Sequence, residues 1–297
     1  MISWIITIGV VCMITSVIFY KPYLGIAFVI LSIPFEGIIE FGCISIYPLE
    51  AILAILCLIC IYKLIVGMDN CFRNTKLVYC CIPFVLCIML SAMKSIEFSL
   101  TVKEIVRWLE LFVIYYITIN LINDEKKLRI ILYFIFFTVA VVSILGIIDH
   151  LRMEHRAISL FGNSNPLAGY VNLIIPVLFG MMMTKVSLWE KRTLFIITIL
   201  SAMIWCLTFS KVAWISLVLT MVFLFFQTKS KKRGTFFLAI FFAILAIAFL
   251  IPDLRDDLVD KVSLDKLHYT FKYRSTCYAV GYDMLKDDSI LGIGIGN

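Results

Sequence analysis

Charged residues are scarce in this chain of 297 residues, and their scarcity excludes an ordinary soluble domain. Asp, Glu, Lys and Arg make up 15% of the sequence, whereas hydrophobic residues make up 62%. Soluble domains carry roughly 25% charged and 45–50% apolar residues. The net charge of +6 does not indicate a nucleic-acid surface, because the charges lie in clusters between long apolar runs, as topology determinants do. The sequence therefore predicts a membrane protein with no nucleic-acid partner.

Histidine is scarce as well, with three residues, and most of the ten cysteines stand inside apolar runs. Cys57 and Cys60 form a CxxC pair with no flanking turn and no histidine beside it. We interpret the cysteines as small apolar residues rather than as metal ligands or a disulfide framework. The first apolar run, 2–20, has no basic leader and no cleavage pattern, so it is interpreted as a retained span.

The sequence instead contains a series of apolar runs long enough to cross a bilayer as helices. A helix needs about 20 apolar residues for this, and no alternation typical of strands is present. The second run contains Pro34 and is either a span or a re-entrant segment. The predicted fold is all-α, a polytopic transmembrane helix bundle with about nine or ten spans. The expected spans are 2–20, 22–35, 49–66, 77–93, 105–122, 130–148, 167–184, 193–209, 212–227 and 235–251.

The basic residues predict the orientation. The loops that contain Lys21, 63–76, 126–129, 185–192 and 229–233 carry more than twice as many Lys and Arg as the opposite short loops. The positive-inside rule places the richer set in the cytoplasm. The expected organisation is a transmembrane region at 1–251 and an extracytoplasmic segment at 252–297. In that outer segment, 253–267 is expected to form an amphipathic helix on the membrane surface and 273–285 another helix.

Two polar segments are predicted at the outer ends of spans. The segment 161–169 is rich in Gly, Asn and Pro and opens the seventh span, where Asn163 or Asn165 can cap the helix and Pro166 suits its first position. Such a helix start is either a simple capped junction or an anion site. The segment 207–211 joins two spans with almost no loop. Lys211 there either snorkels from a helix end or contacts a phosphate together with Thr208 and Ser210.

Two further places carry charge on the same side. The first turns of the fifth span hold Lys103, Glu104, Arg107 and Glu110 at helical spacing, so that Arg107 can pair with an acid. This group is either an interfacial ion-pair cluster or the lining of an outer site. The end of the chain contains Arg274 and a GIGIG run. The run follows no predicted strand, so it is interpreted as a tight turn rather than a dinucleotide loop.

Three of these segments, taken in order, resemble the O-antigen ligase and O-antigen polymerase family of bacterial envelope proteins. The resemblance covers about 161–297. It rests on Gly162-Asn163-Ser164-Asn165-Pro166-Leu167-Ala168, on Thr208-Phe209-Ser210-Lys211, and on Arg274 to Tyr278 with Asp288 to Asn297. Departures are Lys211 in place of the usual Arg, which loses the bidentate fork, Tyr278 in place of Trp, and Ser289-Ile290 in the proline register. The family's proposed catalytic His lies beyond the glycine run, so we expect a fragment or a chain without that His.

The resemblance implies glycan transfer from a polyprenyl-diphosphate-linked glycan to an acceptor glycan or lipid, at the outer face of the cytoplasmic membrane and without a metal or nucleotide cofactor. The leaving group is a diphosphate, so cations should stabilise its departure. The predicted catalytic residues are Lys211 and Arg274. The predicted substrate-binding residues are Asn163, Asn165, Arg107, Thr208 and Ser210. His150, His155 and His268 are interpreted as ordinary histidines.

Two alternatives remain open from the sequence. A flippase of a lipid-linked oligosaccharide would place polar groups near the membrane midplane and show repeated halves. The spans here are nearly free of charge, and the polar candidates gather on one side, which favours the enzyme. A non-catalytic fragment or an assembly scaffold is the other alternative, because the expected His is missing. The choice between polymerase and ligase depends on the acceptor, which the residues do not specify.

Overall fold

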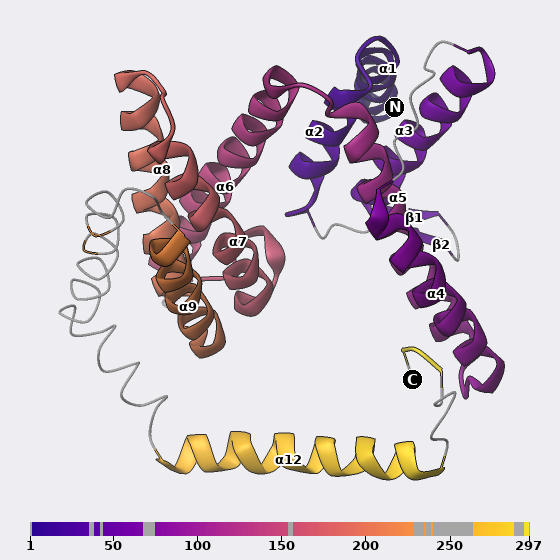
Figure 1. Ribbon diagram of the computed structural model, residues 1–297, viewed down its shortest axis with the longest axis vertical. Coiled ribbons are helices and arrows are strands. Elements are labelled where there is room, and N and C mark those ends of the chain that lie inside the picture. The colour runs from indigo at the N-terminus through magenta and orange to yellow at the C-terminus, as the bar shows by residue number, and fades with distance from the viewer. Residues whose placement is uncertain are drawn as a thin grey trace. The chain divides into compact units, whose positions relative to one another are not determined.

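The computed structural model describes residues 2–35, 39–41, 44–67, 75–153, 157–227, 264–287 and 294–296, with the single residues 235 and 239. Nearly all of these residues are helical (Figure 1). The helices are α1 (Ile2–Tyr20), α2 (Tyr23–Ser32), α3 (Pro48–Ile65), α4 (Lys76–Ser91), α5 (Phe98–Leu121), α6 (Glu125–Met153), α7 (Ser164–Met183), α8 (Leu188–Leu207), α9 (Lys211–Gln227) and α12 (Leu264–Asp287), with the short 3-10 turns η1 (Ala92–Lys94) and η2 (Ser159–Phe161).

The chain divides into two compact units. The first contains Met1–Ile26, Leu53–Leu128 and Lys261–Asn297, and the second contains Ala27–Ile52 and Arg129–Asp260. Among the described residues, four helical segments are long and apolar enough to cross a membrane: Pro48–Ile65, Lys76–Lys94, Glu125–Arg152 and Ser164–Met183. The protein is a multi-pass membrane protein of the all-α class, as predicted. The expected span at 235–251 and the expected surface helix at 253–267 lie almost wholly outside the described residues. The helix expected at 273–285 is confirmed within α12.

In the second unit, α7 is central and packs against both α8 and α9, with α6 beside them (Figure 1). Buried side chains from all four helices form one apolar core. The close approach of α6 to α8 depends on Gly146, because a Cβ atom there would lie 2.6 Å from Cδ1 of Ile204 and 3.1 Å from Cβ of Ser159. The core includes Phe136, Val139, Leu167, Val171, Leu178, Ile204, Trp205 and Leu217.

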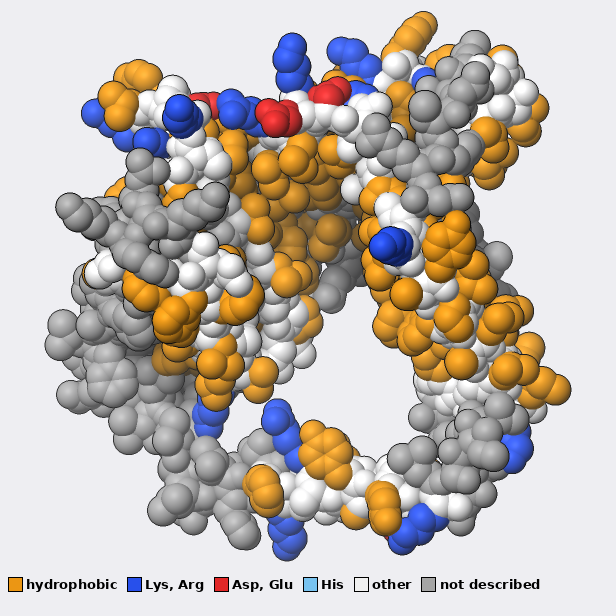
Figure 2. All heavy atoms as spheres, viewed as in Figure 1, with side chains coloured by type: hydrophobic (Ala, Val, Ile, Leu, Met, Phe, Trp, Pro, Cys, Tyr) orange, Lys and Arg blue, Asp and Glu red, His pale blue; other side chains and the backbone are white. Residues whose placement is uncertain are grey.

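In the first unit, α4 packs against α5. The ring of Phe84 meets the rings of Trp108 and Phe112 edge-on, at centroid distances of 5.0 and 5.9 Å. Much of the remaining surface of α4 is apolar and exposed, and hydrophobic side chains cover the drawn face of this helix (Figure 2). Exposed apolar surface along a predicted span is the surface that lipid covers.

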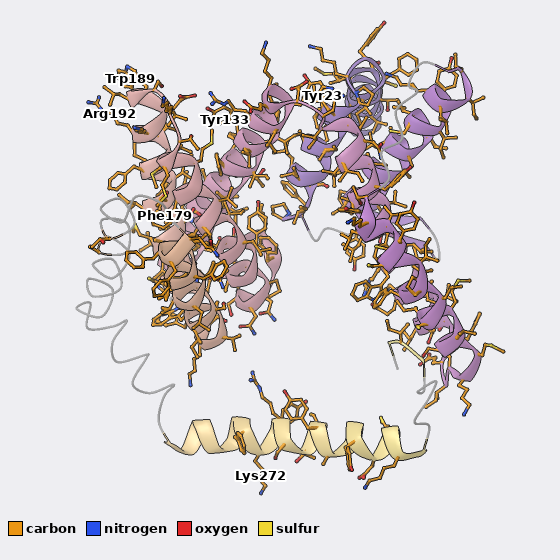
Figure 3. The ribbon with its side chains drawn as sticks, viewed as in Figure 1. Tyr23, Tyr133, Phe179, Trp189, Arg192 and Lys272 are labelled. Atoms are coloured by element: carbon orange, nitrogen blue, oxygen red, sulfur yellow. The ribbon has the colours of Figure 1, made fainter. Side chains whose placement is uncertain are left out.

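The first turn of α8 holds a hydrogen-bonded acid in the predicted cytoplasmic segment 185–192. Ser187 and Glu190 form a capping box. Tyr133 donates its hydroxyl to Oε1 of Glu190 over 2.5 Å, and Arg129 lies 3.9 Å from the same oxygen. The hydrogen bond from Tyr133, followed by those from Ser187, lowers the pKa of Glu190 below its ordinary value. Beside it, Arg192 lies over the ring of Trp189 at 5.4 Å (Figure 3).

Two features of the fold differ from the sequence prediction. A short antiparallel hairpin, β1 (Ile39–Phe41) with β2 (Ile44–Ile46), stands where no strand was expected. Its isoleucines are β-branched and favour extended backbone, but three residues a strand are too few to give a recognisable alternation. In addition, α5 begins at Phe98, whereas the predicted span begins at 105. The charged residues that suggested the later start are part of the helix.

Candidate functional site

The start of α7 carries the first polar segment. Asn163 is the N-cap in extended conformation, and its Oδ1 accepts a hydrogen bond from the backbone N–H of Asn165 over 2.9 Å. Of the two predicted caps, the structure selects Asn163. Gly162 before it has a positive φ of 60°, which a side chain would strain. Pro166 stands at the third helical position instead of the predicted first, where its missing N–H still leaves no helical bond unmade.

The junction between α8 and α9 carries the second polar segment. Thr208 is fully buried, and its hydroxyl donates to the carbonyl of Trp205 over 2.7 Å. Phe209 is 4% exposed and adopts a positive φ of 51°, a conformation that costs a non-glycine residue about 1–2 kcal/mol. Ser210 is buried, and the exposed Lys211 is the first residue of α9. The turn therefore reverses the chain with no spare residues, and Lys211 is fixed at the helix start.

The structure brings these two segments to the same end of the second unit. The N–H of Ala157, which precedes η2, donates to the carbonyl of Leu207 over 3.1 Å. The hydroxyl of Ser159 donates to the carbonyl of Val142 on α6 over 2.9 Å. The loop that leads into Asn163 is therefore fastened both to α6 and to the end of α8. The two polar segments therefore lie at the same end of the second unit.

Arg107 and Arg274 belong to the first unit. Arg107 pairs with Glu104 on the same helix, and both side chains remain partly exposed. The predicted pairing of Arg107 with an acid is confirmed, with Glu104 as the partner one turn away. Gly296, with φ of 87°, packs on this turn. A Cβ atom at Gly296 would lie 2.7 Å from Cγ of Glu104 and 3.4 Å from the carbonyl oxygen of Leu100. Gly296 thus contacts the charged start of α5.

Arg274 lies in the middle of α12 with an exposed side chain. Phe271 and Tyr278 stand three residues before and four residues after it, on the same side of the helix, and are 73% and 76% exposed. Lys272, two residues before Arg274, is labelled in Figure 3. The helix thus offers a guanidinium between two aromatic rings.

Sequence reasoning missed Asn172, a half-buried residue two turns into α7. Its Nδ2 donates to the carbonyl of Ala213 over 3.1 Å and to Oγ of Ser216 over 2.5 Å, both on α9. Its Oδ1 accepts from Nε1 of Trp205 on α8 over 3.0 Å. An amide inside an otherwise apolar predicted span was the available signal, because polar side chains at that depth are expensive and mark specific contacts.

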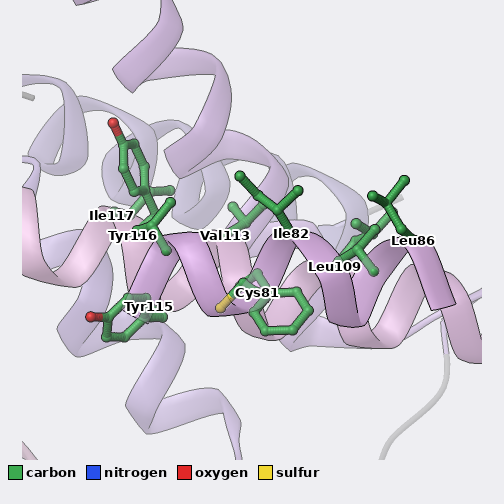
Figure 4. A pocket seen from close by; sticks show the side chains of 11 residues that line it. Cys81, Ile82, Leu86, Leu109, Val113, Tyr115, Tyr116 and Ile117 are labelled. Carbon is green, nitrogen blue, oxygen red and sulfur yellow. The ribbon is translucent and has the colours of Figure 1, made fainter. Parts of the chain in front are cut away.

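An apolar groove of about 400 Å³ runs between α4 and α5 (Figure 4). Its walls are aliphatic and aromatic, with Cys81 on one side and the rings of Tyr115 and Tyr116 on the other. Such a lining offers hydrocarbon contacts and no charge. It does not supply the chemistry of the polar segments.

Comparison with known proteins places part of the chain in a family. Residues 196–297 match the family model described as O-antigen ligase. No curated protein and no solved structure matches the chain. The matched stretch contains Thr208, Ser210, Lys211 and Arg274, so it covers two of the three segments on which the resemblance rests. The match supports the predicted resemblance to the O-antigen ligase and polymerase family, whose members process glycans, over residues 196–297.

Proposed function

We propose that this protein transfers a glycan from a polyprenyl-diphosphate carrier to an acceptor glycan or lipid at the outer face of the cytoplasmic membrane. The observation that carries the proposal is the constrained α8–α9 turn inside the matched stretch, which holds Lys211 at the end of the second unit that also carries the capped start of α7. A cation held at a helix junction suits a diphosphate leaving group, because it needs no reorganisation when charge develops.

The proposed reaction is a displacement at the anomeric carbon of the donor sugar. The oxygen of an acceptor hydroxyl forms the new bond to that carbon, and the bond from the carbon to the diphosphate oxygen breaks with its electron pair leaving on the diphosphate. The proton of the hydroxyl passes to a general base. In this proposal Lys211 stabilises the negative charge of the departing diphosphate, and Arg274 and Arg107 are the further cations that the sequence predicts for the same role.

The other predicted polar residues of the second unit have supporting roles in this proposal. Asn163 holds the start of α7, and Asn165 contributes an exposed amide to the donor or the acceptor. Thr208 and Ser210 act from inside the turn, because both are buried and the hydroxyl of Thr208 is engaged with a carbonyl. The transmembrane region at 1–251 and the outer segment at 252–297 are the two parts that supply these groups.

The flippase alternative predicts polar groups that face a cargo near the midplane. Asn172 is a polar side chain two turns into α7. Its amide nitrogen and oxygen are both engaged by neighbouring helices. This use of the amide within the protein favours the transferase.

The test is a deletion of the gene in the bacterium that carries it, followed by gel analysis of surface polysaccharide and of lipid-linked intermediates. We expect long polysaccharide chains to disappear, with single repeat units or undelivered chains left on the lipid. A complementing copy with Lys211→Met should fail, whereas Lys191→Met, a matched change in the predicted cytoplasmic segment, should restore the chains. Unchanged polysaccharide in the deletion strain would refute the function. Donor trapped on the cytoplasmic face would favour the flippase.

A further inference from the structure

The amide of Asn172 joins three helices at one point. It accepts from Trp205 on α8 and donates to Ala213 and Ser216 on α9, while its own backbone belongs to α7. Ser216 adds a bond of 3.0 Å from its hydroxyl to the same carbonyl of Ala213. Both halves of the amide are engaged, so the side chain has one arrangement that satisfies it.

The hydrogen-bond partners of Asn172 lie on both sides of the α8–α9 turn. Trp205 lies three residues before the buried Thr208, and Ala213 lies two residues after Lys211. The indole rings of Trp205 and Trp214 also stack across the turn at a centroid distance of 5.6 Å. Residues before and after the turn therefore both form hydrogen bonds with the side-chain amide of Asn172 on α7. Rotation or sliding of the first turn of α9 would break at least one of these bonds.

The membrane raises the cost of breaking them. An amide or indole N–H that loses its partner inside a bundle finds no water to replace it. Interhelical hydrogen bonds of this kind contribute on average about 0.6 kcal/mol each in a membrane protein, because the alternative states also find partners. Three such bonds at one residue restrict the position of α9 more than one bond would.

We propose that Asn172 is a positioning residue for Lys211: it fixes the first turn of α9 against α7, so that the lysine at the start of α9 keeps one position relative to α7. The inference rests on the proposed function for the meaning of that position, but the positioning itself is measurable without any glycan. Asn172 touches no substrate in this assignment and acts through the helix that carries the lysine.

The direct test measures how accessible position 211 is. Lys211→Cys is made in the full chain with the ten native cysteines replaced by Ala or Ser, reconstituted in vesicles, and labelled with a membrane-impermeant maleimide. Adding Asn172→Leu should change the labelling rate by about threefold or more, since about 0.6 kcal/mol per lost bond corresponds to roughly threefold. Ser216→Ala, which removes one of the three partners, should give a smaller change in the same direction and covers the case in which Asn172→Leu does not fold.

The matched control is Thr198→Val. Thr198 is buried on α8, and its hydroxyl bonds to Leu194 within its own helix. This variant removes a buried hydroxyl from the same bundle and should leave the labelling rate unchanged. Equal rates in all variants would overturn the positioning role. Equal changes with Thr198→Val and Asn172→Leu would also overturn it, because they would indicate general loosening.

The second arm separates this inference from the proposed function. Glycan transfer is measured in membranes that supply the native lipid-linked donor and acceptor, with the native lysine present. Asn172→Leu should lower kcat about tenfold while the KM for the donor changes less than about twofold, because the misplaced cation is needed most when charge develops. Altered labelling with unaltered transfer would support the positioning and refute the role of Lys211 in the reaction. A KM effect alone would contradict positioning for the charge-developing step.

Discussion

Phe209 in the α8–α9 turn has a left-handed backbone conformation, so we expect its glycine variant to be more stable than its alanine variant. Phe209 has φ of 51° and is 4% exposed. Phe209→Ala and Phe209→Gly both remove the buried ring and leave a similar cavity. They differ in backbone, because alanine keeps the left-handed strain of about 1–2 kcal/mol and glycine relieves it. The larger conformational freedom of unfolded glycine offsets about 0.5–1 kcal/mol of this. The free energy of unfolding of the glycine variant should therefore exceed that of the alanine variant by about 0–1.5 kcal/mol.

The assay is reversible unfolding of the purified protein in mixed micelles, with thermal unfolding in detergent as a second measurement. In an ordinary helix interior the order is opposite, since glycine is about 0.8–1 kcal/mol less favourable than alanine. Leu217 supplies that reference, because it is fully buried within α9. Leu217→Gly should be less stable than Leu217→Ala. If Phe209→Gly is also clearly less stable than Phe209→Ala, the turn is not held in the left-handed conformation and the reasoning about Lys211 loses its basis.

Three other changes have defined outcomes. Lys211→Arg should keep transfer within about tenfold of the parent, whereas Lys211→Met should lose about 10²–10³ in kcat, measured as glycan transfer in membranes. The lowered pKa of Glu190 means that its contribution to stability is present above its ordinary pKa of 4.5 and is lost as pH falls below it. Tyr133→Phe removes the hydrogen bond that contributes most to the lowered pKa of Glu190, so the free energy of unfolding should fall less steeply as the pH drops below 4.5. An unchanged dependence on pH would contradict this. Gly146→Val should destabilise the second unit by about 1–3 kcal/mol in micelle unfolding, because the added atoms overlap Ile204 and Ser159.

The helices could be predicted closely because the bilayer leaves few choices. The first run was expected at 2–20 and is observed at Ile2–Tyr20, and the seventh, eighth and ninth spans agree with α7, α8 and α9 to within a few residues. Backbone groups in hydrocarbon must bond within their own segment, so a long apolar run decides the structure without tertiary information. The cap by Asn163 was predictable for the same local reason, since its partner is two residues away.

What could not be predicted depends on contacts between distant residues. The partners of Asn172 lie more than 30 residues away in the sequence. An apolar run with one amide has the same sequence pattern whether that amide faces lipid, water or another helix. The early start of α5 was missed because charge was taken as the edge of the bilayer, while Arg107 and Glu104 pair within the helix. The contact of Gly296 with Glu104 joins segments almost 200 residues apart.

The hydrogen bond between the N–H of Ala157 and the carbonyl of Leu207 also limits how many times the chain can cross the membrane between these two residues. Two atoms 3.1 Å apart lie on the same side of a bilayer, so the chain between them crosses it an even number of times. The intervening segment consists of η2, α7 and α8. Since α7 is long and apolar enough to cross the membrane, α8 must return the chain to the starting side. Reporter tags inserted at 162 and at 209 must therefore be found on the same side of the membrane, whichever orientation the protein has. Any mutation of flanking charges that reverses the orientation would move both polar segments together.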